Sequence, residues 1–380
     1  MIESGYLRSL AGSLAIWLGL FLAVTWTIDP YGVSPIRIAL PGINVLKPKR
    51  LDIDRVLKPY EVWRYQPRTI FLGTSRFQQA IDPSVLDGTR FAPAYNASIP
   101  KGSVAMNADY LRQYVRLDHN LRTVIVELFL NNFLGPPDAG APSAWSEFIG
   151  NAVTLFASSD TLWASIATLA HNVVNGRPTF EIKPGGYLYY PPGHNPQGPF
   201  DGFVTWMWSP DRGEPDRPML YPSVFESFRE IIEIARAHDI ELIFVATPNH
   251  AYVDYYYDVV GAWGLIEEWL VKLSRQATVY SFAQPNAWVY EPVDSRMAYW
   301  NDTFHFSLTM GRGMLAALAR LPMPDLPGDF MERLTPERVA SHIESRRGAV
   351  RLWAQANPAF VMRALERRKW LAGQAVRKPE

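Results

Sequence analysis

Residues 68 to 76 read R-T-I-F-L-G-T-S-R, a short strand-like run that stops at a glycine. Thr69 to Leu72 is apolar and carries the residue types that strands favour. Ser75 is therefore expected to project from the end of a strand. Ligand sites in parallel sheets lie beyond the carboxyl ends of the strands, so Ser75 becomes a candidate nucleophile.

Apolar runs alternate with amphipathic ones along the rest of the chain. We expect further strands at 123–130, 241–246 and 278–282, and helices at 103–117, 222–238, 264–275 and 308–321. Strands separated by helices predict an α/β fold, a three-layer arrangement with a parallel sheet flanked by helices. Asn131 and Thr247 also fall just past expected strand ends.

Asp302 and His305 supply what a serine nucleophile needs. A serine hydroxyl becomes reactive when an imidazole takes its proton and a carboxylate orients that imidazole. The chain offers these groups in the order Ser75, Asp302, His305. The alternative is a plain turn at Ser75, with Asp302 a helix N-cap and His305 a surface residue. The G-x-S-x-G pattern of α/β-hydrolases is absent, because no glycine follows Ser75 at the second position.

Composition excludes several classes of function. The chain has 380 residues, a formal net charge of +0 and 48% hydrophobic residues, so it can bury a large core and shows no electrostatic basis for a nucleic-acid partner. It has no cysteine, which excludes disulfides, thiolate catalysis and cysteine-bound zinc. This composition suits an oxidising compartment.

Residues 10 to 28 form a charge-free, mostly apolar run. As a helix it would be about 28 Å long, close to the hydrocarbon thickness of a bilayer. A cleaved signal peptide and a buried core helix are the alternatives, and we favour an uncleaved transmembrane anchor. The expected location is the inner membrane, single-pass, with the bulk of the chain extracytoplasmic, in the periplasm.

The expected organisation has five parts: a tail at 1–9, the anchor at 10–28, a linker at 29–65, a catalytic domain at 66–321 and a helical C-terminal extension at 322–380. An insertion at 136–218 interrupts the domain, with a helix at 151–174 followed by a long loop. Such loops are often lids or binding segments. Its aromatic residues either stack on sugar rings or pin the loop to the body: Tyr187, Tyr189, Tyr190, His194, Phe200, Trp206 and Trp208. The extension is expected to be a solvated helix pair (336–353 and 358–371), with a partner or a membrane surface as alternatives.

Four blocks carry a resemblance to a known family. They are Phe71 to Arg76, Tyr95 to Gly102, Trp300 to Phe306, and the Asp29-Pro30-Tyr31-Gly32 step after the apolar run. Together they resemble the SGNH (GDSL-type) hydrolase superfamily, in its membrane-anchored bacterial branch similar to alginate O-acetyltransferases and D-alanyl transfer proteins. The resemblance implies an SGNH or flavodoxin-like sheet and a reaction that needs neither a cofactor nor a metal.

By this resemblance Ser75 is the nucleophile, His305 the base and Asp302 its orienter. The oxyanion hole would use the Ser75 N–H, the Gly102 N–H and an asparagine side chain, namely Asn131 or else Asn96 or Asn132. The family's Gly-x-Asn-Asp block is absent, and Thr74 stands where the first block usually has Asp.

Three further residues have open assignments. Arg76 either holds a polar substrate group or forms the solvent side of the turn. His250 either lines the cleft, contacting substrate or serving as a second base, or is a surface histidine, which we favour. Glu127, in a buried strand, is expected to pair with a basic neighbour.

The chain is thus expected to be a membrane-anchored serine esterase or O-acyltransferase. Its substrate would be a polysaccharide or another acyl ester at the cell surface. The alternative is a non-catalytic envelope scaffold or glycan-binding protein on the same fold, with a partner in an envelope complex.

Overall fold

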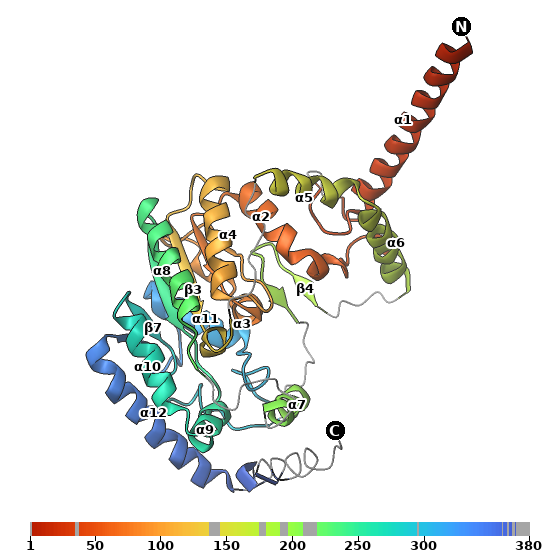
Figure 1. Cartoon of the computed structure of the whole chain (residues 1–380). Helices are drawn as coiled ribbons and strands as arrows, with labels where there is room; N and C mark the ends of the chain where they lie inside the picture. Colours follow the sequence, from red (N-terminus) through yellow and green to blue (C-terminus); the bar gives the residue numbers. More distant parts are fainter. Residues whose placement is uncertain are drawn as a thin grey trace, which may run out of the picture.

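A six-stranded sheet forms the centre of the molecule (Figure 1). The computed structural model describes residues 2–34, 38–136, 145–174, 180–190, 197–207, 219–294, 296–358, 360–362, 365–366 and 369. In spatial order the strands are β2 (Ala94–Asn96), β1 (Thr69–Leu72), β3 (Thr123–Leu128), β6 (Glu241–Ala246), β7 (Val279–Ser281) and β8 (Glu332–Leu334). All neighbours pair in parallel except β7 and β8, which are antiparallel. The predicted α/β fold with a mostly parallel sheet flanked by helices is confirmed.

The central strands are mostly apolar because both faces of the sheet are covered. In β3, Val124 and Val126 belong to one core cluster and Ile125 to the other. Alternate residues of a strand point to opposite faces, so a strand covered on both sides needs apolar residues at successive positions. This explains the run T-V-I-V-E-L and makes its glutamate, Glu127, the exception that needs a partner.

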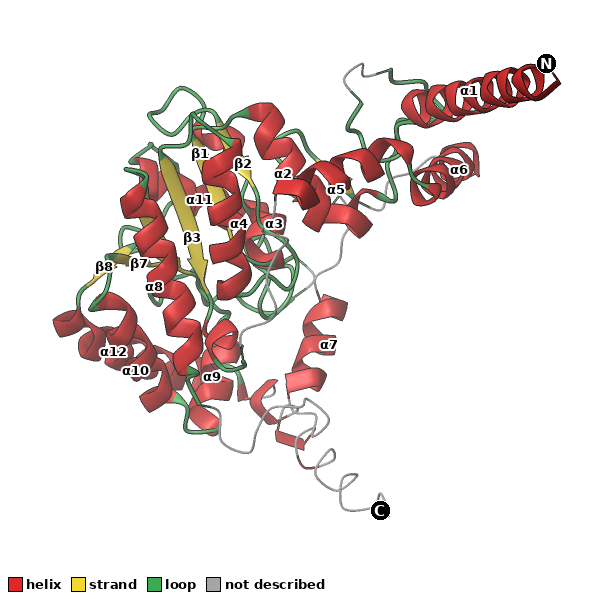
Figure 2. Cartoon of the chain, turned by 45° about the horizontal axis from the view of Figure 1, so that its top comes forward, coloured by secondary structure: helices red, strands yellow, loops and turns green. Residues whose placement is uncertain are grey.

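The helices divide between the two faces of the sheet (Figures 1 and 2). One core cluster contains residues of α2 (Asp54–Tyr65), α4 (Val104–Leu117), α8 (Pro222–Ala237), α9 (Ala251–Val259) and α10 (Trp263–Ser274). The other contains residues of α3 (Ser75–Ala80) and α11 (Leu308–Ala319). Helix α12 (Pro336–Ala356) packs on α9 and α10, so this part of the extension belongs to the folded body rather than to a solvated pair. The short 3-10 helices are η1 (Arg50–Ile53), η2 (Pro83–Leu86) and η3 (Leu130–Phe133).

Residues 54–65 of the expected linker form helix α2, which packs against α4. Its Leu57 and Val62 are fully buried. Lys58 is also buried, and its ammonium donates to the carbonyl of Asn96 over 2.6 Å. This segment is therefore part of the body.

The expected insertion contains more regular structure than its sequence suggests. The helix expected at 151–174 is two helices, α5 (Trp145–Ala157) and α6 (Ser159–Val174), separated at Ser158. The expected loop contains β4 (Glu181–Ile182) and β5 (Leu188–Tyr189), which form a small antiparallel sheet, and then α7 (Gln197–Met207). His194, Trp208 and residues 371–380 lie outside the described residues.

Helix α1 (Ile2–Ile28) projects from the body as a separate rod (Figure 1). Its segment Gly5–Ile28 is long and apolar enough to cross a membrane, and none of its most apolar window is buried in the protein. In Figure 2 the tip of β3 points away from the end of the molecule that carries α1. The carboxyl ends of the parallel strands therefore lie away from α1.

Candidate active site

Ser75, His305 and Asp302 form a hydrogen-bonded relay at the carboxyl ends of the strands. Ser75 Oγ lies 2.8 Å from Nε2 of His305, although the two residues are 230 positions apart in sequence. On the other side of the ring, His305 Nδ1 lies 2.7 Å from Oδ2 of Asp302. When Nδ1–H donates to the carboxylate, Nε2 is left to accept the serine proton. The Ser75 side chain is partly exposed, so a substrate can reach it.

The histidine and the aspartate lie in a tight turn that precedes α11. Trp300 and Phe306 pair across the base of this turn. Asp302 Oδ1 accepts the backbone N–H groups of Phe304 and His305, each over 2.8 Å, which leaves Oδ2 for the ring. The N-cap of α11 is Ser307. The alternative that Asp302 caps this helix is therefore wrong.

Ser75 is the first residue of α3, and Glu127 fixes the turn that leads into this helix. The Thr74 N–H and hydroxyl both donate to Glu127 Oε2, over 2.7 and 2.8 Å. Thr74 Oγ1 also accepts the N–H of Arg76 as the helix N-cap. A Cβ at position 73 would lie 2.7 Å from Glu127 Oε2, so only glycine fits there. Gly73 and Glu127 together hold the nucleophile in place.

Arg76 connects the helix of the nucleophile to the turn of the base. Its side chain is buried, and Nε donates to the carbonyl of Phe304 over 2.9 Å. Nη2 donates to the carbonyl of Pro248, and Nε lies 3.7 Å from Glu127 Oε1. The guanidinium also stacks 4.4 Å from the ring centre of Phe129. The alternative that Arg76 lies on the solvent side is wrong, and the expected basic partner of Glu127 is confirmed.

Two of the proposed oxyanion donors already have partners within the protein. The N–H of Gly102 donates to the carbonyl of Ile99 over 2.9 Å. A Cβ at position 102 would lie 2.7 Å from the Gly73 carbonyl, so this glycine lets its loop approach the turn of Ser75. Asn132 donates through Nδ2 to the Gly102 carbonyl over 3.0 Å. Both residues shape the edge of the site.

The other two asparagines differ from each other. Asn96 is fully buried, and its Nδ2 donates to the carbonyls of Phe77 and Ile81 over 2.8 and 2.9 Å, so it holds the end of α3 instead of facing a substrate. Asn131 Oδ1 accepts the Tyr257 hydroxyl over 3.5 Å. Within the described part of the chain, the Asn131 amide nitrogen has no hydrogen-bond partner.

His250 caps α9 and is buried, so the interpretation as a surface histidine is wrong. Its Nδ1 accepts the N–H of Tyr252 over 3.1 Å, and Nε2 donates to the carbonyl of Glu291 over 2.8 Å. Burial lowers its pKa from 6.5 to about 4. A neutral ring with both nitrogens occupied offers nothing to a substrate.

Aromatic side chains from the expected insertion lie beside the relay and its turn. The Phe203 ring, on α7, lies 5.8 Å from the His305 ring. Trp206, one turn later, lies 6.2 Å from Phe304 and is 43% exposed. Burial, and next the charge of Asp302, raise the pKa of Tyr190, which follows β5. Tyr190 and Trp206 belong to the aromatic residues named above from the sequence, and Phe203 does not. The three-residue spacing of Phe203 and Trp206 is the sequence signal for Phe203, because residues so spaced share one face of a helix.

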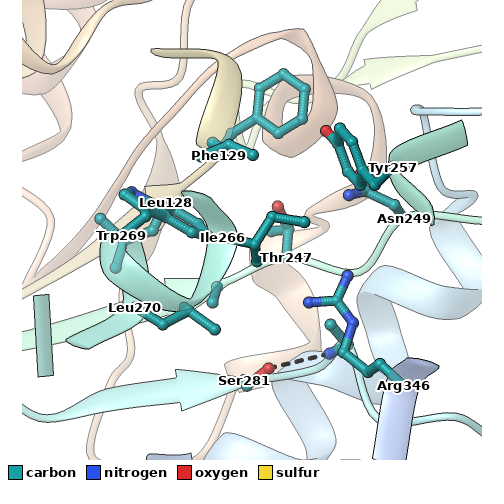
Figure 3. Close-up of a pocket in the computed structure, with 13 residues that line it drawn as sticks. Leu128, Phe129, Thr247, Asn249, Tyr257, Ile266, Trp269, Leu270, Ser281 and Arg346 are labelled. Atoms are coloured by element: carbon teal, nitrogen blue, oxygen red, sulfur yellow. Dashed lines mark hydrogen bonds between the residues drawn. The ribbon is translucent and has the colours of Figure 1, made fainter. Parts of the chain in front are cut away.

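A small, mostly apolar cavity lies at the carboxyl ends of β3, β6 and β7 (Figure 3). Thr247, Asn249 and Tyr257 line it, and the Arg346 side chain reaches into it from α12. Its volume of about 20 Å³ accommodates a water-sized molecule and excludes a sugar or an acyl chain. This cavity therefore cannot serve as the binding site for an ester substrate.

No protein-family model matches the chain, and a search of curated proteins found no significant match. Among the residues that the structure describes, no group of three or more His, Asp or Glu side chains could hold a metal ion.

Proposed function

We propose that this chain is a membrane-anchored serine esterase or O-acyltransferase that acts on acyl esters of an extracytoplasmic polysaccharide. The Ser75–His305–Asp302 relay carries the proposal, because its two distances, 2.8 and 2.7 Å, are those of working general-base pairs. Unrelated folds have arrived at the same constellation for acyl transfer, so the geometry itself is informative.

The relay would support a two-step acyl transfer. Ser75 Oγ attacks the ester carbonyl while its proton passes to Nε2 of His305. The tetrahedral intermediate then expels the alcohol, which takes that proton, and an acyl-enzyme remains. In the second step a water molecule or a sugar hydroxyl gives its proton to His305 and attacks the acyl carbon, and Ser75 recovers its proton. Asp302 stabilises the imidazolium in both steps.

Two donors in the structure support an oxyanion hole. The N–H of Ser75 opens α3, and the Asn131 side chain follows β3 at the same edge of the sheet. Because the Asn131 amide nitrogen has no partner among the described residues, Asn131 is the asparagine that we assign to this role. Donors held in place before the reaction stabilise the developing charge without reorganising.

The strand order supports an SGNH-type fold. Counting only the strands of the main sheet, the parallel ones lie in the order second, first, third, fourth, fifth, which is the order of flavodoxin-like doubly wound sheets. In these sheets ligands bind at the carboxyl edge, where the relay lies. The four resembling sequence blocks add to this argument.

Two features support the cellular setting and the class of substrate. Helix α1 has the length and apolarity of a membrane anchor, and we assign it to the inner membrane with the body outside the cytoplasm. Trp206 is exposed beside the relay, and an exposed indole face suits the apolar face of a sugar ring.

A fluorophosphonate probe tests the nucleophile in the full-length protein in detergent micelles. The wild type should become labelled at Ser75, and Ser75→Ala should remain unlabelled. Ser341→Ala, which removes an exposed serine on α12, is the matched control and should label like the wild type. A folded wild type that stays unlabelled, or that is labelled at another serine, would contradict the proposal and favour a non-catalytic scaffold or glycan-binding protein.

A radiolabelled acyl-enzyme separates hydrolysis from transfer. After acylation from an activated ester, release of free acid alone indicates an esterase. Transfer of the label to an added oligosaccharide, in competition with water, indicates an O-acyltransferase.

A further inference from the structure

Helix α6 buries its polar side and exposes its apolar side. The buried residues are small or polar, namely Thr161, Ala164, Ser165, Thr168 and Asn172. The exposed ones are large and apolar, namely Trp163, Ile166, Leu169, Val173 and Val174. A helix on the surface of a water-soluble domain has the opposite arrangement. Helices in lipid pack through small and polar residues and turn their large apolar residues outward.

The inward face of α6 is held by specific polar contacts. Ser165 donates to the carbonyl of Thr161 over 2.8 Å, and Thr161 donates to the carbonyl of Thr154 on α5 over 2.6 Å. Asn172 both accepts from the N–H of Leu46 and donates to its carbonyl, each over 2.9 Å. The contacts of Thr161 with Thr154 and of Asn172 with Leu46 fix the rotation of the helix, so its apolar side faces outward.

Helices α5 and α6 pack against the end of α1. Thr25 on α1 donates to the carbonyl of Phe156 over 3.2 Å, and the rings of Trp26 and Phe156 lie 6.1 Å apart. On α1 the covered positions are Phe21, Leu22, Thr25 and Ile28, whereas residues 5–20 are exposed. The two helices therefore flank only the last two turns of the apolar rod.

The composition of this helical pair matches its position. Between Trp145 and Val174 the chain has two acidic residues, Glu147 and Asp160, and no lysine or arginine. Val153 on α5 is also exposed. A segment with so few charged side chains makes few favourable interactions with water on its outer side.

We infer that the outward face of α6 lies in the interfacial region of the bilayer, beside the point where α1 leaves the membrane. The inference rests on the proposal that α1 is a membrane anchor. Phe21 to Ile28 spans about 10 Å of helix, which matches the depth of about 5–10 Å at which interfacial helices lie. Helix α6 is about 24 Å long, too short to cross the hydrocarbon core, so it lies in one leaflet.

Lipid is a better occupant of this face than a second protein. Helix α6 packs against α1, so a membrane around α1 would also reach the outward face of α6. Trp163, which is 68% exposed, is of the residue type that concentrates at the membrane–water interface. The protein would thus contact the membrane through both α1 and α6.

Single-cysteine labelling tests the inference, because the full-length chain has no cysteine of its own. An environment-sensitive fluorophore is placed at Val173→Cys or Ile166→Cys on α6, and at Trp17→Cys on α1. The protein is reconstituted in vesicles of phosphatidylcholine and phosphatidylglycerol. Leu352→Cys on α12 is the matched control, since Leu352 and Val173 are both 67% exposed. Fluorophosphonate labelling of Ser75, or a thermal melt if the probe does not react, verifies that each variant is folded.

The expected result is blue-shifted emission and quenching by brominated lipids at positions 173, 166 and 17, with quenching by aqueous iodide at position 352. Iodide quenching at 173 and 166, with lipid quenching kept at 17, would overturn the inference and leave the anchor in place. Iodide quenching at position 17 would overturn both the proposed membrane anchor and this inference. A label at 173 that neither quencher reaches would show that a second copy of the chain covers this face, which also overturns it.

Discussion

The two ends of the molecule break the rules of a soluble globular protein in opposite ways. At the carboxyl ends of the strands, charged side chains are buried, among them Arg76 and Glu127. At the end that carries α1, large apolar side chains are exposed, among them Trp163 and Val173. In water, the buried charges at one end and the exposed apolar side chains at the other each lower the stability of the fold. Buried charge is tolerated where it positions a reactive group, and exposed apolar surface is tolerated where lipid replaces water.

This comparison predicts that the two ends are functionally separate. Changes near the relay should affect activity or acid stability and leave membrane contact unchanged. Changes on α6 should affect membrane contact and leave the chemistry unchanged.

Asp302→Asn should give the largest effect. The amide oxygen can still accept the N–H groups of Phe304 and His305, so the turn is kept. The amide nitrogen would face Nδ1 of His305 and force the tautomer in which Nε2 cannot take the serine proton. The rate of p-nitrophenyl acetate hydrolysis should fall about 10⁴-fold. Asp294→Asn, which changes an acid in the preceding loop, is the control and should keep full activity, and a wild-type rate in Asp302→Asn would exclude the relay.

His250→Asn should reduce the loss of folding stability that occurs as the pH falls. The folded pKa of about 4 lies below the usual 6.5, so the unfolded chain takes up this proton first as the pH falls. The stabilisation from neutral His250 is complete above about pH 6.5 and is lost as the pH falls toward 4, by about 3 kcal/mol. Asparagine can still cap α9.

Denaturant unfolding between pH 7 and pH 4 measures this effect. The wild type should lose more stability over this range than His250→Asn. His238→Asn, at an exposed histidine, should follow the wild type. Equal slopes for the wild type and His250→Asn would mean that His250 is not buried in its neutral form.

Arg76→Lys should lower kcat for p-nitrophenyl acetate about 100-fold and change KM little, because the base would lose its alignment. Lysine keeps the charge beside Glu127 but lacks the planar fork that reaches the carbonyls of Phe304 and Pro248. Arg312→Lys on α11 is the control, since Arg312 pairs with Asp82 at the surface. A rise in KM at constant kcat would instead assign Arg76 to substrate binding.

Val173→Ala should give the smallest effect, within about 0.5 kcal/mol of the wild-type unfolding free energy in micelles. Phe228→Ala on α8, a helix of the same length as α6, should cost about 3–5 kcal/mol, because Phe228 is fully buried. A loss of several kcal/mol at Val173 would show that its side chain is packed against protein.

The sequence predicts the regular parts of this fold and the relay, since both follow local signals. β1 and β6 were expected with the bounds that the structure has, because short apolar runs between turn residues define buried strands. Ser75 and the Asp302–His305 pair could be brought together because the strand end and the start of the last helix converge at one edge of a parallel sheet.

Non-local contacts explain what the sequence did not predict. Helix α2 contains Pro59 and the buried charges of Lys58 and Glu61, whose partners come from other segments, so its sequence resembles a linker. The amide of Asn96 serves two carbonyls at the end of α3, and no local pattern distinguishes such an amide from one that faces a substrate. The sequence of α6 does not show whether its polar or its apolar face is buried, because only the structure shows which face points outward.

The direction of the parallel strands has a consequence for how reactants are supplied. The tip of β3 points away from α1, so with α1 in the membrane the edge that carries Ser75 would lie clear of the lipid (Figure 2). A reactant that diffuses laterally within the leaflet would pass beneath the body without meeting the nucleophile. Under the proposed function, the acyl donor and the acceptor would then reach Ser75 from the aqueous side, dissolved or held by a carrier that stands clear of the lipid headgroups.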